Sequence, residues 1–256
     1  MSMPPLPIVL VHGIRLSARC WPAVAERVVA ERPVATVDLP GHGTRRGEHF
    51  TLNAAITAIH DSIDSVGGRA VLVGHSLGGF VSTAAAASDP ARVAGLIVAG
   101  ASCPPNRMLA MPFKAMHKAL TARPDGGERI SRRAFERVLP ARVAHDIELG
   151  GIATEAIPDV VAALGNFDLT GSLAAYPGPV WLVNGAHDHF RIGERRTLTA
   201  CEQGRLLVIP RAGHYFPLAR PAEFSELILD IAAACQNRLI SLAGPGNRTV
   251  GQRLGR

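Results

Sequence analysis

The sequence is poor in cysteine, and its cysteines lie far apart. Its 256 residues include four, Cys20, Cys103, Cys201 and Cys235, and no Cys-x-x-Cys pair. This spacing argues against a zinc site and provides no disulfide framework. We therefore expect buried or half-buried thiols, and we expect neither a metal nor a cofactor.

Long apolar runs are also missing. No stretch reaches the about 18 apolar residues that a membrane-spanning helix needs. Residues 1–7 contain no basic region followed by a long apolar segment, so they do not resemble a secretory signal. With 47% hydrophobic and 19% charged residues, the composition is that of a globular chain that can bury a substantial core. We expect one soluble, cytoplasmic domain, with room for an inserted subdomain.

Acidic residues are scarce in one basic segment. Residues 107–142 contain nine Lys or Arg residues and three acidic ones, an excess that equals the net charge of +6 of the whole chain. Such a patch can attract anionic substrates, nucleic acid or anionic lipid. Aromatic residues, which are 5% of the sequence, do not interleave with these charges as platforms for stacked bases would. We therefore expect no nucleic-acid partner and a helical stripe that faces water, formed by Arg129, Arg132, Arg133 and Arg137.

Short apolar runs rich in β-branched residues recur along the chain. They lack polar alternation, which is typical of strands buried on both faces of a parallel sheet. Helical stretches lie between or after them, at residues 21–30, 51–65, 77–88 and 221–234. This alternation predicts an α/β fold with a doubly wound, mainly parallel sheet of about six strands. The expected strands are residues 8–11, 34–37, 70–73, 96–99, 180–183 and 206–209.

One interval between strands is too long for an ordinary crossover. About 80 residues separate Ala99 from Val180, against the few tens that a βαβ unit takes. Residues 108–164 are predicted to be mostly helical, with breaks at Pro112, Pro124, Pro140 and Gly150. We expect a helical cap over the carboxyl edge of the sheet. The predicted organisation is a core of residues 1–102 and 171–240, a cap of residues 103–170, and a mobile tail of residues 241–256.

Three methionines of the predicted cap lie near helical spacing. Met108, Met111 and Met116 are interpreted first as part of the core of the cap, since apolar stripes on helices usually pack inward. Methionine also suits an adaptable apolar pocket. These three residues and Phe113 could therefore form an apolar wall against a substrate.

The segment Gly74-His-Ser-Leu-Gly78 matches the pattern G-x-S-x-G. It follows a predicted buried strand and precedes a predicted helix, which is the context that gives this pattern meaning. Glycines on both sides permit a sharp turn, and the helix directs its N-terminal N–H groups toward the site. The segment predicts that Ser76 is a nucleophile, the alternative being an ordinary glycine-rich turn.

A serine hydroxyl needs a base, and this kind of fold supplies an acid and then a histidine later in the chain. Asp188 and His214 each follow a predicted strand, at the edge where open α/β sheets place ligands. We expect His214 to be the general base and Asp188 the acid that orients it. The rival histidines and acids, ranked lower, are His12, His42, His75, His187, His189, Asp38 and Asp168.

Acyl transfer also requires N–H donors for an oxyanion. The backbone of Leu77, directly after the nucleophile, and that of Ile14, in the loop after the first strand, are the expected donors. Gly13 lets this loop turn inward. His12, Gly13 and His75 lie near the same edge, and we count them as candidate substrate contacts.

Together these motifs resemble those of the α/β-hydrolase superfamily. The resemblance covers nearly the whole chain except the cap and tail. Within the superfamily the chain looks like the compact group that includes plant methylesterases and hydroxynitrile lyases, because Cys20-Trp21 follows shortly after the strand that ends in His12-Gly13. Dehalogenases and epoxide hydrolases are similar in fold only, because they use an aspartate where this chain has Ser76. The motifs are residues 10–13, 38–43, 74–79, 184–188 and 212–214.

The resemblance implies a cofactor-independent serine hydrolase of carboxylic esters, thioesters or lactones that forms an acyl-enzyme on Ser76. Two alternatives stay open, because one superfold hosts many reactions. The first is a C–C hydrolase or a lyase with the same three residues, in which Lys114 or Lys118 could serve an anionic leaving group. The second is a ligand receptor of hydrolase fold with little turnover.

Overall fold

A six-stranded parallel sheet forms the centre of the molecule in the computed structural model, which describes residues 3–243. The strand order β2-β1-β3-β4-β5-β6 confirms the predicted doubly wound α/β fold. The order reverses between β1 and β3, and such a reversal is where open α/β sheets place their ligands. The strands are β1 (Ile8–Val11), β2 (Val34–Val37), β3 (Ala70–His75), β4 (Val93–Ala99), β5 (Pro179–Gly185) and β6 (Gln203–Ile209).

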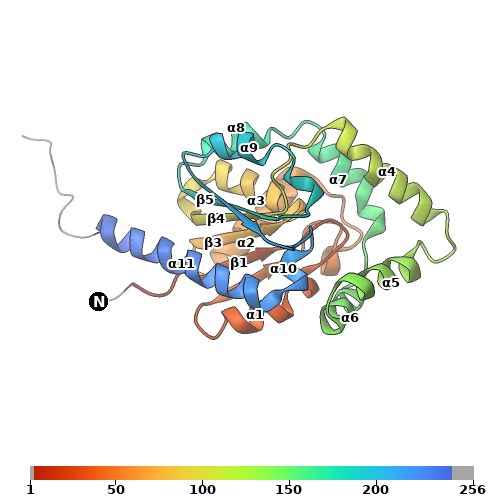
Figure 1. The fold of residues 1–256 in the computed structure, drawn as a ribbon, viewed down its shortest axis with the longest axis horizontal. Helices are drawn as coiled ribbons and strands as arrows, with labels where there is room; N and C mark the ends of the chain where they lie inside the picture. The colour runs from red at the N-terminus through yellow and green to blue at the C-terminus, as the bar shows by residue number, and fades with distance from the viewer. Residues whose placement is uncertain (1–2, 244–256) are drawn as a thin grey trace, which may run out of the picture.

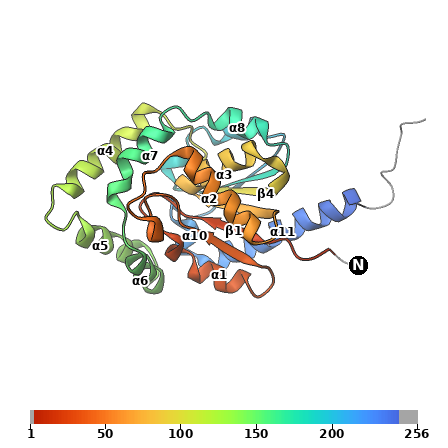
Figure 2. The same cartoon turned by 180° about the vertical axis from the view of Figure 1, so that it is seen from behind.

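Helices cover both faces of the sheet (Figures 1 and 2). Side chains alternate along each strand, so that Leu10 belongs to the hydrophobic core on one face while Val9 and Val11 belong to the core on the other. On the first face lie α1 (Pro22–Val28) and α11 (Pro221–Ala243). The second face is covered by α2 (Leu52–Ser65), α3 (Leu77–Ser88) and α8 (Leu169–Ala175).

The last helix is longer than the sequence pattern predicts. Residues 221–234 were expected to be helical, but α11 ends at Ala243, so residues 241–243 of the expected tail belong to it. The apolar residues Phe224, Ile228, Ile231 and Cys235 of α11 are buried against the sheet. The remainder of the expected tail, residues 244–256, lies outside the described residues.

Four helices fill most of the interval between β4 and β5. They are α4 (Arg107–Thr121), α5 (Glu128–Val138), α6 (Ala141–Gly150) and α7 (Ile157–Leu164), and they gather at one end of the molecule in both views (Figures 1 and 2). We call residues 103–170 the inserted segment. Of the expected solvated stripe on α5, Arg129, Arg133 and Arg137 are exposed. Arg132 does not fit this expectation, because it is half-buried and its Nη1 lies 2.8 Å from Oε1 of Glu148.

The prediction that Pro112 breaks the first helix of this segment was wrong. Pro112 lies inside α4. The start of α4 is fixed by Asn106, whose Oδ1 accepts hydrogen bonds from the N–H groups of Met108 at 2.9 Å and Leu109 at 3.0 Å. The proline removes one helical bond, to the carbonyl of Met108, which belongs to an exposed residue and can bond to water instead.

Short helices complete the connections. No helix within residues 3–243 is long and apolar enough to cross a membrane. All four cysteines are free thiols; Cys20, Cys103 and Cys235 are buried and Cys201 is half-buried. The short helices are η1 (Ala18–Cys20), η2 (Gly43–Arg45), η3 (Pro90–Arg92), η4 (Thr154–Ala156), η5 (His189–Arg191), α9 (Glu194–Thr199) and α10 (Phe216–Ala219).

Candidate active site

Ser76 lies on a strained turn between β3 and α3. Its φ of 53° and ψ of −116° are rarely adopted by residues other than glycine. A serine at this N-cap position normally accepts a hydrogen bond from the first turn of its helix, but the Ser76 side chain makes no such bond. Its Oγ instead lies 3.1 Å from Nε2 of His214.

Two glycines make this turn possible. A Cβ atom on Gly74 would lie 2.2 Å from the carbonyl oxygen of Gly78, and one on Gly78 would lie 2.3 Å from the carbonyl oxygen of Val11. Both distances are far below van der Waals contact, so glycine at position 74 lets the turn close on itself, and glycine at position 78 lets it pack against the end of β1.

His214 and Asp188 meet Ser76 from the loops that follow β6 and β5. Nδ1 of His214 lies 3.0 Å from Oδ2 of Asp188. Oδ1 of Asp188 accepts a hydrogen bond from the N–H of Phe190 at 2.8 Å. Burial raises the pKa of Asp188, but the hydrogen bond and charge of His214, together with the Phe190 N–H, outweigh it and lower the pKa overall. An ionised Asp188 keeps the Nδ1 proton on His214 and leaves Nε2 free to accept the Ser76 proton.

The two rival acids have other partners. Asp38 accepts hydrogen bonds from the N–H of Ala18 at 2.7 Å and from the N–H and hydroxyl of Thr44 at 2.9 and 2.8 Å. Asp168 caps α8 by accepting from the N–H of Gly171 at 2.9 Å. Both carboxylates thus hold backbone turns together, and neither contacts His214.

The rival histidines either form hydrogen bonds with backbone groups or are exposed. His12, a candidate substrate contact, is fully buried and lines neither cavity at Ser76. Its Nδ1–H donates to the carbonyl of Gly13 at 2.8 Å, and its Nε2 accepts from the N–H of Leu39 at 3.1 Å. Burial, helped by the nearby His42, lowers its pKa to about 3, so the ring stays neutral.

His42 is buried and lies 2.9 Å through Nδ1 from the carbonyl of Pro40. His187 and His189 are exposed. The His189 ring is 5.8 Å from the His214 ring, centroid to centroid, while both ring nitrogens of His214 are taken up by Asp188 and Ser76. Of these histidines, only His214 touches both Ser76 and Asp188.

The backbones of Ile14 and Leu77 flank Ser76 as expected. Both residues line the same cavity as the serine, and Leu77 opens α3. Within residues 3–243, no hydrogen-bond acceptor engages either N–H group. Because the N-terminus of α3 adds its partial positive charge, these groups can stabilise a negative oxygen next to Ser76.

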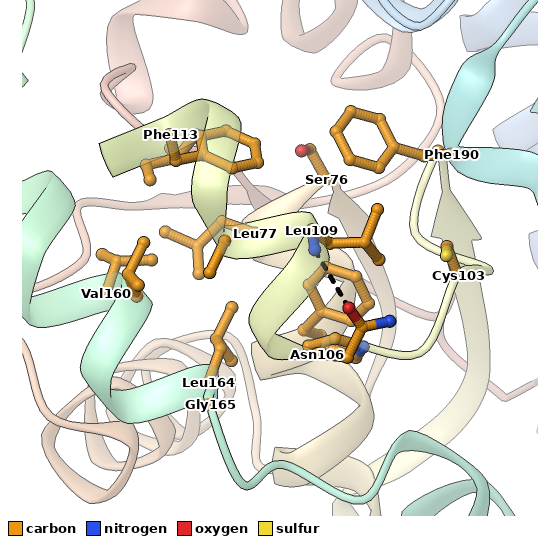
Figure 3. Close-up of a pocket in the computed structure, with 16 residues that line it drawn as sticks. Ser76, Leu77, Cys103, Asn106, Leu109, Phe113, Val160, Leu164, Gly165 and Phe190 are labelled. Carbon is orange, nitrogen blue, oxygen red and sulfur yellow. Dashed lines mark hydrogen bonds between the residues drawn. The ribbon is translucent and has the colours of Figure 1, made fainter. Parts of the chain in front are cut away.

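A narrow apolar cavity of ≈ 70 Å³ opens beside Ser76. In the view of Figure 3 the rings of Phe113 and Phe190, whose centroids are 6.1 Å apart, appear on either side of the Ser76 side chain. Leu77, Leu109, Val160 and Leu164 lie on the side away from the serine hydroxyl. We call this the apolar cavity. Its lining also includes Ile14, Phe80, Cys103, Pro105 and Ala110.

A second cavity of ≈ 300 Å³ opens on the His214 side of Ser76. It shares Ile14, Ser76, Leu109, Phe113 and Phe190 with the apolar cavity, so the serine lies where the two meet. We call it the wider cavity. Its own lining is more polar and includes Gly13, Arg15, His75, Met116, His189, His214 and Tyr215.

The expected apolar wall of the inserted segment is only half present. Phe113 lines both cavities and Met116 lines the wider one. Met108 and Met111 are 82% and 64% exposed, so they belong neither to a substrate wall nor to a core. The inward stripe of α4 contains Leu109, Phe113, Met116 and Leu120, and α4 is therefore rotated relative to the expected methionine stripe.

The sequence interpretation also missed lining residues outside α4. Val160 and Leu164 come from α7, one helical turn apart, and Phe190 follows Asp188 by two positions. Helical spacing of Val160 and Leu164 was a usable signal. Arg15, next to the expected oxyanion donor Ile14, was missed because a charged residue is usually exposed.

Comparison with known proteins agrees with this architecture. The chain is 26% identical over 252 residues to a pimeloyl-[acyl-carrier protein] methyl ester esterase of Cronobacter sakazakii, covering 90% of this chain and 94% of that protein. It is 35% identical over 96 residues to lipase LipV of Mycobacterium tuberculosis, covering 37% of this chain and 36% of the lipase. Three curated relatives with 35–40% identity are matched over only 25–36% of their own length.

The fold has close counterparts among solved structures. A thermophilic esterase from Thermogutta terrifontis superposes with a TM-score of 0.75 at 22% identity, covering 92% of each chain. Residues 8–227 match the pattern of the family described as the Alpha/beta hydrolase family. This match runs from the first residue of β1 into α11 and includes Ser76, Asp188 and His214. The chain therefore belongs to the α/β-hydrolase family.

Proposed function

We propose that the chain is a serine hydrolase of carboxylic esters, thioesters or lactones. The observation that carries this proposal is the contact of Ser76 Oγ with Nε2 of His214 at 3.1 Å, while Nδ1 of the same ring lies 3.0 Å from the buried Asp188. A nucleophile, a base and an orienting acid within hydrogen-bond reach of one another are what acyl transfer requires. The relatives named as esterases and a lipase support the same class of reaction.

In the proposed reaction, Ser76 Oγ attacks the substrate carbonyl and its proton passes to Nε2 of His214. Asp188 stabilises the imidazolium that forms. The carbonyl oxygen becomes negatively charged and accepts hydrogen bonds from the N–H groups of Ile14 and Leu77. The tetrahedral intermediate collapses when His214 returns the proton to the leaving alcohol, thiol or lactone oxygen. A water, activated by the same histidine, then releases the acyl group and regenerates Ser76.

We assign the inserted segment the role of a cap that shapes the substrate site. Leu109 and Phe113 of α4 and Val160 and Leu164 of α7 face Ser76 across the apolar cavity. Apolar side chains around a few convergent polar groups are typical of small-molecule sites. The apolar cavity would hold an uncharged hydrocarbon part of the substrate, and its walls would decide which lengths fit.

The test is turnover of p-nitrophenyl esters of increasing chain length by the wild type, Ser76→Ala and Ser82→Ala. Ser82 is buried within α3, the helix that follows Ser76, and its hydroxyl has no partner within the described residues, so it is the matched control. We expect Ser76→Ala to lower kcat by up to about 10⁶-fold, with the fold retained, and Ser82→Ala to resemble the wild type. A fluorophosphonate should label the wild type and Ser82→Ala but not Ser76→Ala.

The same experiment separates the alternatives. Ester turnover that survives Ser76→Ala would refute the assignment of the nucleophile. Labelling of Ser76 without turnover of any ester would instead favour a lyase, a C–C hydrolase or a receptor that uses the same three residues.

A further inference from the structure

Arg15 is a buried cation in the wall of the wider cavity. It directly follows the expected oxyanion donor Ile14, adopts a positive φ of 67°, and is only 8% exposed. Its Nη2 donates to the hydroxyls of Ser131 and, at 3.2 Å, of Thr154. Its Nη1 lies 3.7 Å from the Met116 sulfur, a weak acceptor.

These partners are all uncharged. Nε of Arg15 is buried and has no hydrogen-bond partner within residues 3–243. Over the same residues no carboxylate lies within 4.0 Å of the Arg15 guanidinium, whereas Arg46, Arg132 and Arg142 each form an ion pair with a carboxylate. The charge of Glu155 acts on Arg15 from a distance and opposes the lowering of its pKa, but Glu155 is half-exposed and forms its ion pair with Arg46. Burial consequently lowers the pKa of Arg15.

A buried charge that lacks a counter-charge is costly, and proteins usually pair it. A guanidinium also presents five N–H donors in a planar fork that matches carboxylate and phosphate oxygens. Arg15 therefore lacks a negatively charged partner, such as a carboxylate or a phosphate, within the described residues. The open space beside it is the wider cavity, which it shares with Ser76, His214 and Tyr215.

We propose that Arg15 binds an oxyanion group, a carboxylate or a phosphate, carried by the substrate of the reaction at Ser76. This inference rests on the proposed function and narrows its substrate class. The substrate would be an ester whose uncharged hydrocarbon part occupies the apolar cavity and whose anionic part occupies the wider cavity, on the other side of the scissile carbonyl. Arg15 is then a specificity-determining residue, placed one position from an oxyanion donor.

A purely structural role makes a different prediction. Arg15 also connects the loop after β1 to the inserted segment, because its guanidinium meets Ser131 and Thr154 and its carbonyl accepts from the N–H of Ala153 at 3.0 Å. If this connection were its whole role, loss of the guanidinium would slow neutral and anionic substrates equally. Anion binding predicts a selective loss.

The experiment measures kcat/KM of the wild type and Arg15→Gln with matched butyrate esters. The neutral ester is ethyl butyrate, and the anionic ones are O-butyryl glycolate and 2-(butyryloxy)ethyl phosphate, which distinguish the two oxyanion sources. A second pair, p-nitrophenyl butyrate and mono-p-nitrophenyl glutarate, places the carboxylate on the acyl side. We expect the wild type to prefer an anionic member, and Arg15→Gln to slow that member by about 10- to 100-fold while the neutral ester changes by less than about 3-fold.

Arg129→Gln/Arg133→Gln is the matched control, because these two arginines are exposed on α5 and line neither cavity. It should leave the anionic preference unchanged. Equal losses on neutral and anionic esters in Arg15→Gln, no anionic preference in the wild type, or loss of the preference in the surface variant would each overturn the proposal.

A second measurement keeps Arg15 intact and needs no turnover. Binding of the same esters to Ser76→Ala is followed by the rise in Tm that each ligand causes. The preferred anionic ester should bind at least about 10-fold more tightly than its neutral partner. Equal binding would overturn the role of Arg15. Selective anion binding by Ser76→Ala, together with a wild type that hydrolyses none of the esters, would overturn the proposed function and leave the anion site standing.

Discussion

Nε2 of His75 lies 3.0 Å from the backbone carbonyl oxygen of His214. The residue before the proposed nucleophile thus holds the loop that carries the proposed base. His75 is buried, and burial, followed by the charge of His214, lowers its pKa to about 3. The neutral ring therefore carries its proton on Nε2 and donates it to the carbonyl. His75 was a candidate substrate contact, and it lines the wider cavity. From this hydrogen bond we infer that it also positions the base.

Replacing His75 tests that role. His75→Leu removes the donor and leaves the carbonyl of His214 unsatisfied, which should cost about 1–3 kcal/mol of unfolding free energy. The displaced base should lower kcat by about 10- to 100-fold with little change in KM. His75→Gln retains an N–H donor and should recover most of both quantities. Steady-state kinetics and urea unfolding measure them, and failure of His75→Gln to rescue kcat would contradict a positioning role.

The backbone strain at Ser76 predicts that two small substitutions differ in their free energy of unfolding. Ser76→Ala keeps a Cβ atom at φ 53°, whereas Ser76→Gly removes it. Relief of a strain of about 1–3 kcal/mol exceeds the entropy cost of about 0.5–1 kcal/mol that glycine adds. Ser76→Gly should therefore be more stable than Ser76→Ala by about 1 kcal/mol in urea unfolding, while both lack esterase activity. Equal stability would mean that the turn holds no strain.

Asp188 and His214 should act as one unit, because the acid works only through the base. His214→Ala should lower kcat by about 10⁶-fold and Asp188→Asn by about 10⁴-fold, and the double variant should be little worse than His214→Ala. Asp168→Asn is the control, since this acid only caps α8 and should leave kcat unchanged. Losses that multiply in the double variant would separate the two residues.

The sheet and the arrangement of Ser76, Asp188 and His214 were predictable from sequence because both depend on local patterns. Apolar runs without alternation indicate strands buried on both faces, and the carboxyl ends of parallel strands share one edge. The three residues follow β3, β5 and β6, so strand positions alone bring them to that edge. Two hydrogen bonds then join them.

The lining of the cavities was less predictable because it depends on how the inserted helices rotate against the core. Hydrophobic spacing on α4 is ambiguous: Met108 and Met111 fit one stripe, and Leu109 and Phe113 fit the next. Packing against α7 selects the second stripe, and that contact is tertiary. Arg15 likewise becomes buried only through Ser131 and Thr154, which are more than a hundred positions away in the chain.

Two buried histidines should make the fold sensitive to mild acid. His12 and His75 have pKa values lowered to about 3, chiefly by burial, against an ordinary value of 6.5. Between these values the unfolded chain binds more protons than the folded one, so stability is full above pH 6.5 and falls as the pH drops below it. Each histidine can contribute a slope of up to about 1.4 kcal/mol per pH unit.

Urea unfolding between about pH 7.5 and about pH 4.5 measures this slope across the ordinary histidine pKa. His12→Gln and His75→Gln should each make the dependence on pH shallower. His187→Gln, at an exposed position, should leave it unchanged. A slope that none of the buried substitutions alters would assign the acid sensitivity to other groups.

The apolar cavity should set the length of the uncharged part of the substrate. Leu164 of α7 faces Ser76 across this cavity (Figure 3). Leu164→Ala deepens the cavity and should favour a longer acyl chain. The ratio of kcat/KM for p-nitrophenyl octanoate to kcat/KM for p-nitrophenyl butyrate should therefore rise about 10-fold, because added methylenes that fit an apolar pocket change kcat/KM by this order. Met111→Ala removes a side chain of similar size that is 64% exposed, and should not change the ratio. Because both substitutions shorten a large apolar side chain of the inserted segment, a general loosening of that segment would shift both ratios alike. An unchanged ratio in Leu164→Ala would place the acyl group outside the apolar cavity. An equal shift in Met111→Ala would assign the effect to loosening of the segment and would also contradict a direct contact of Leu164 with the substrate.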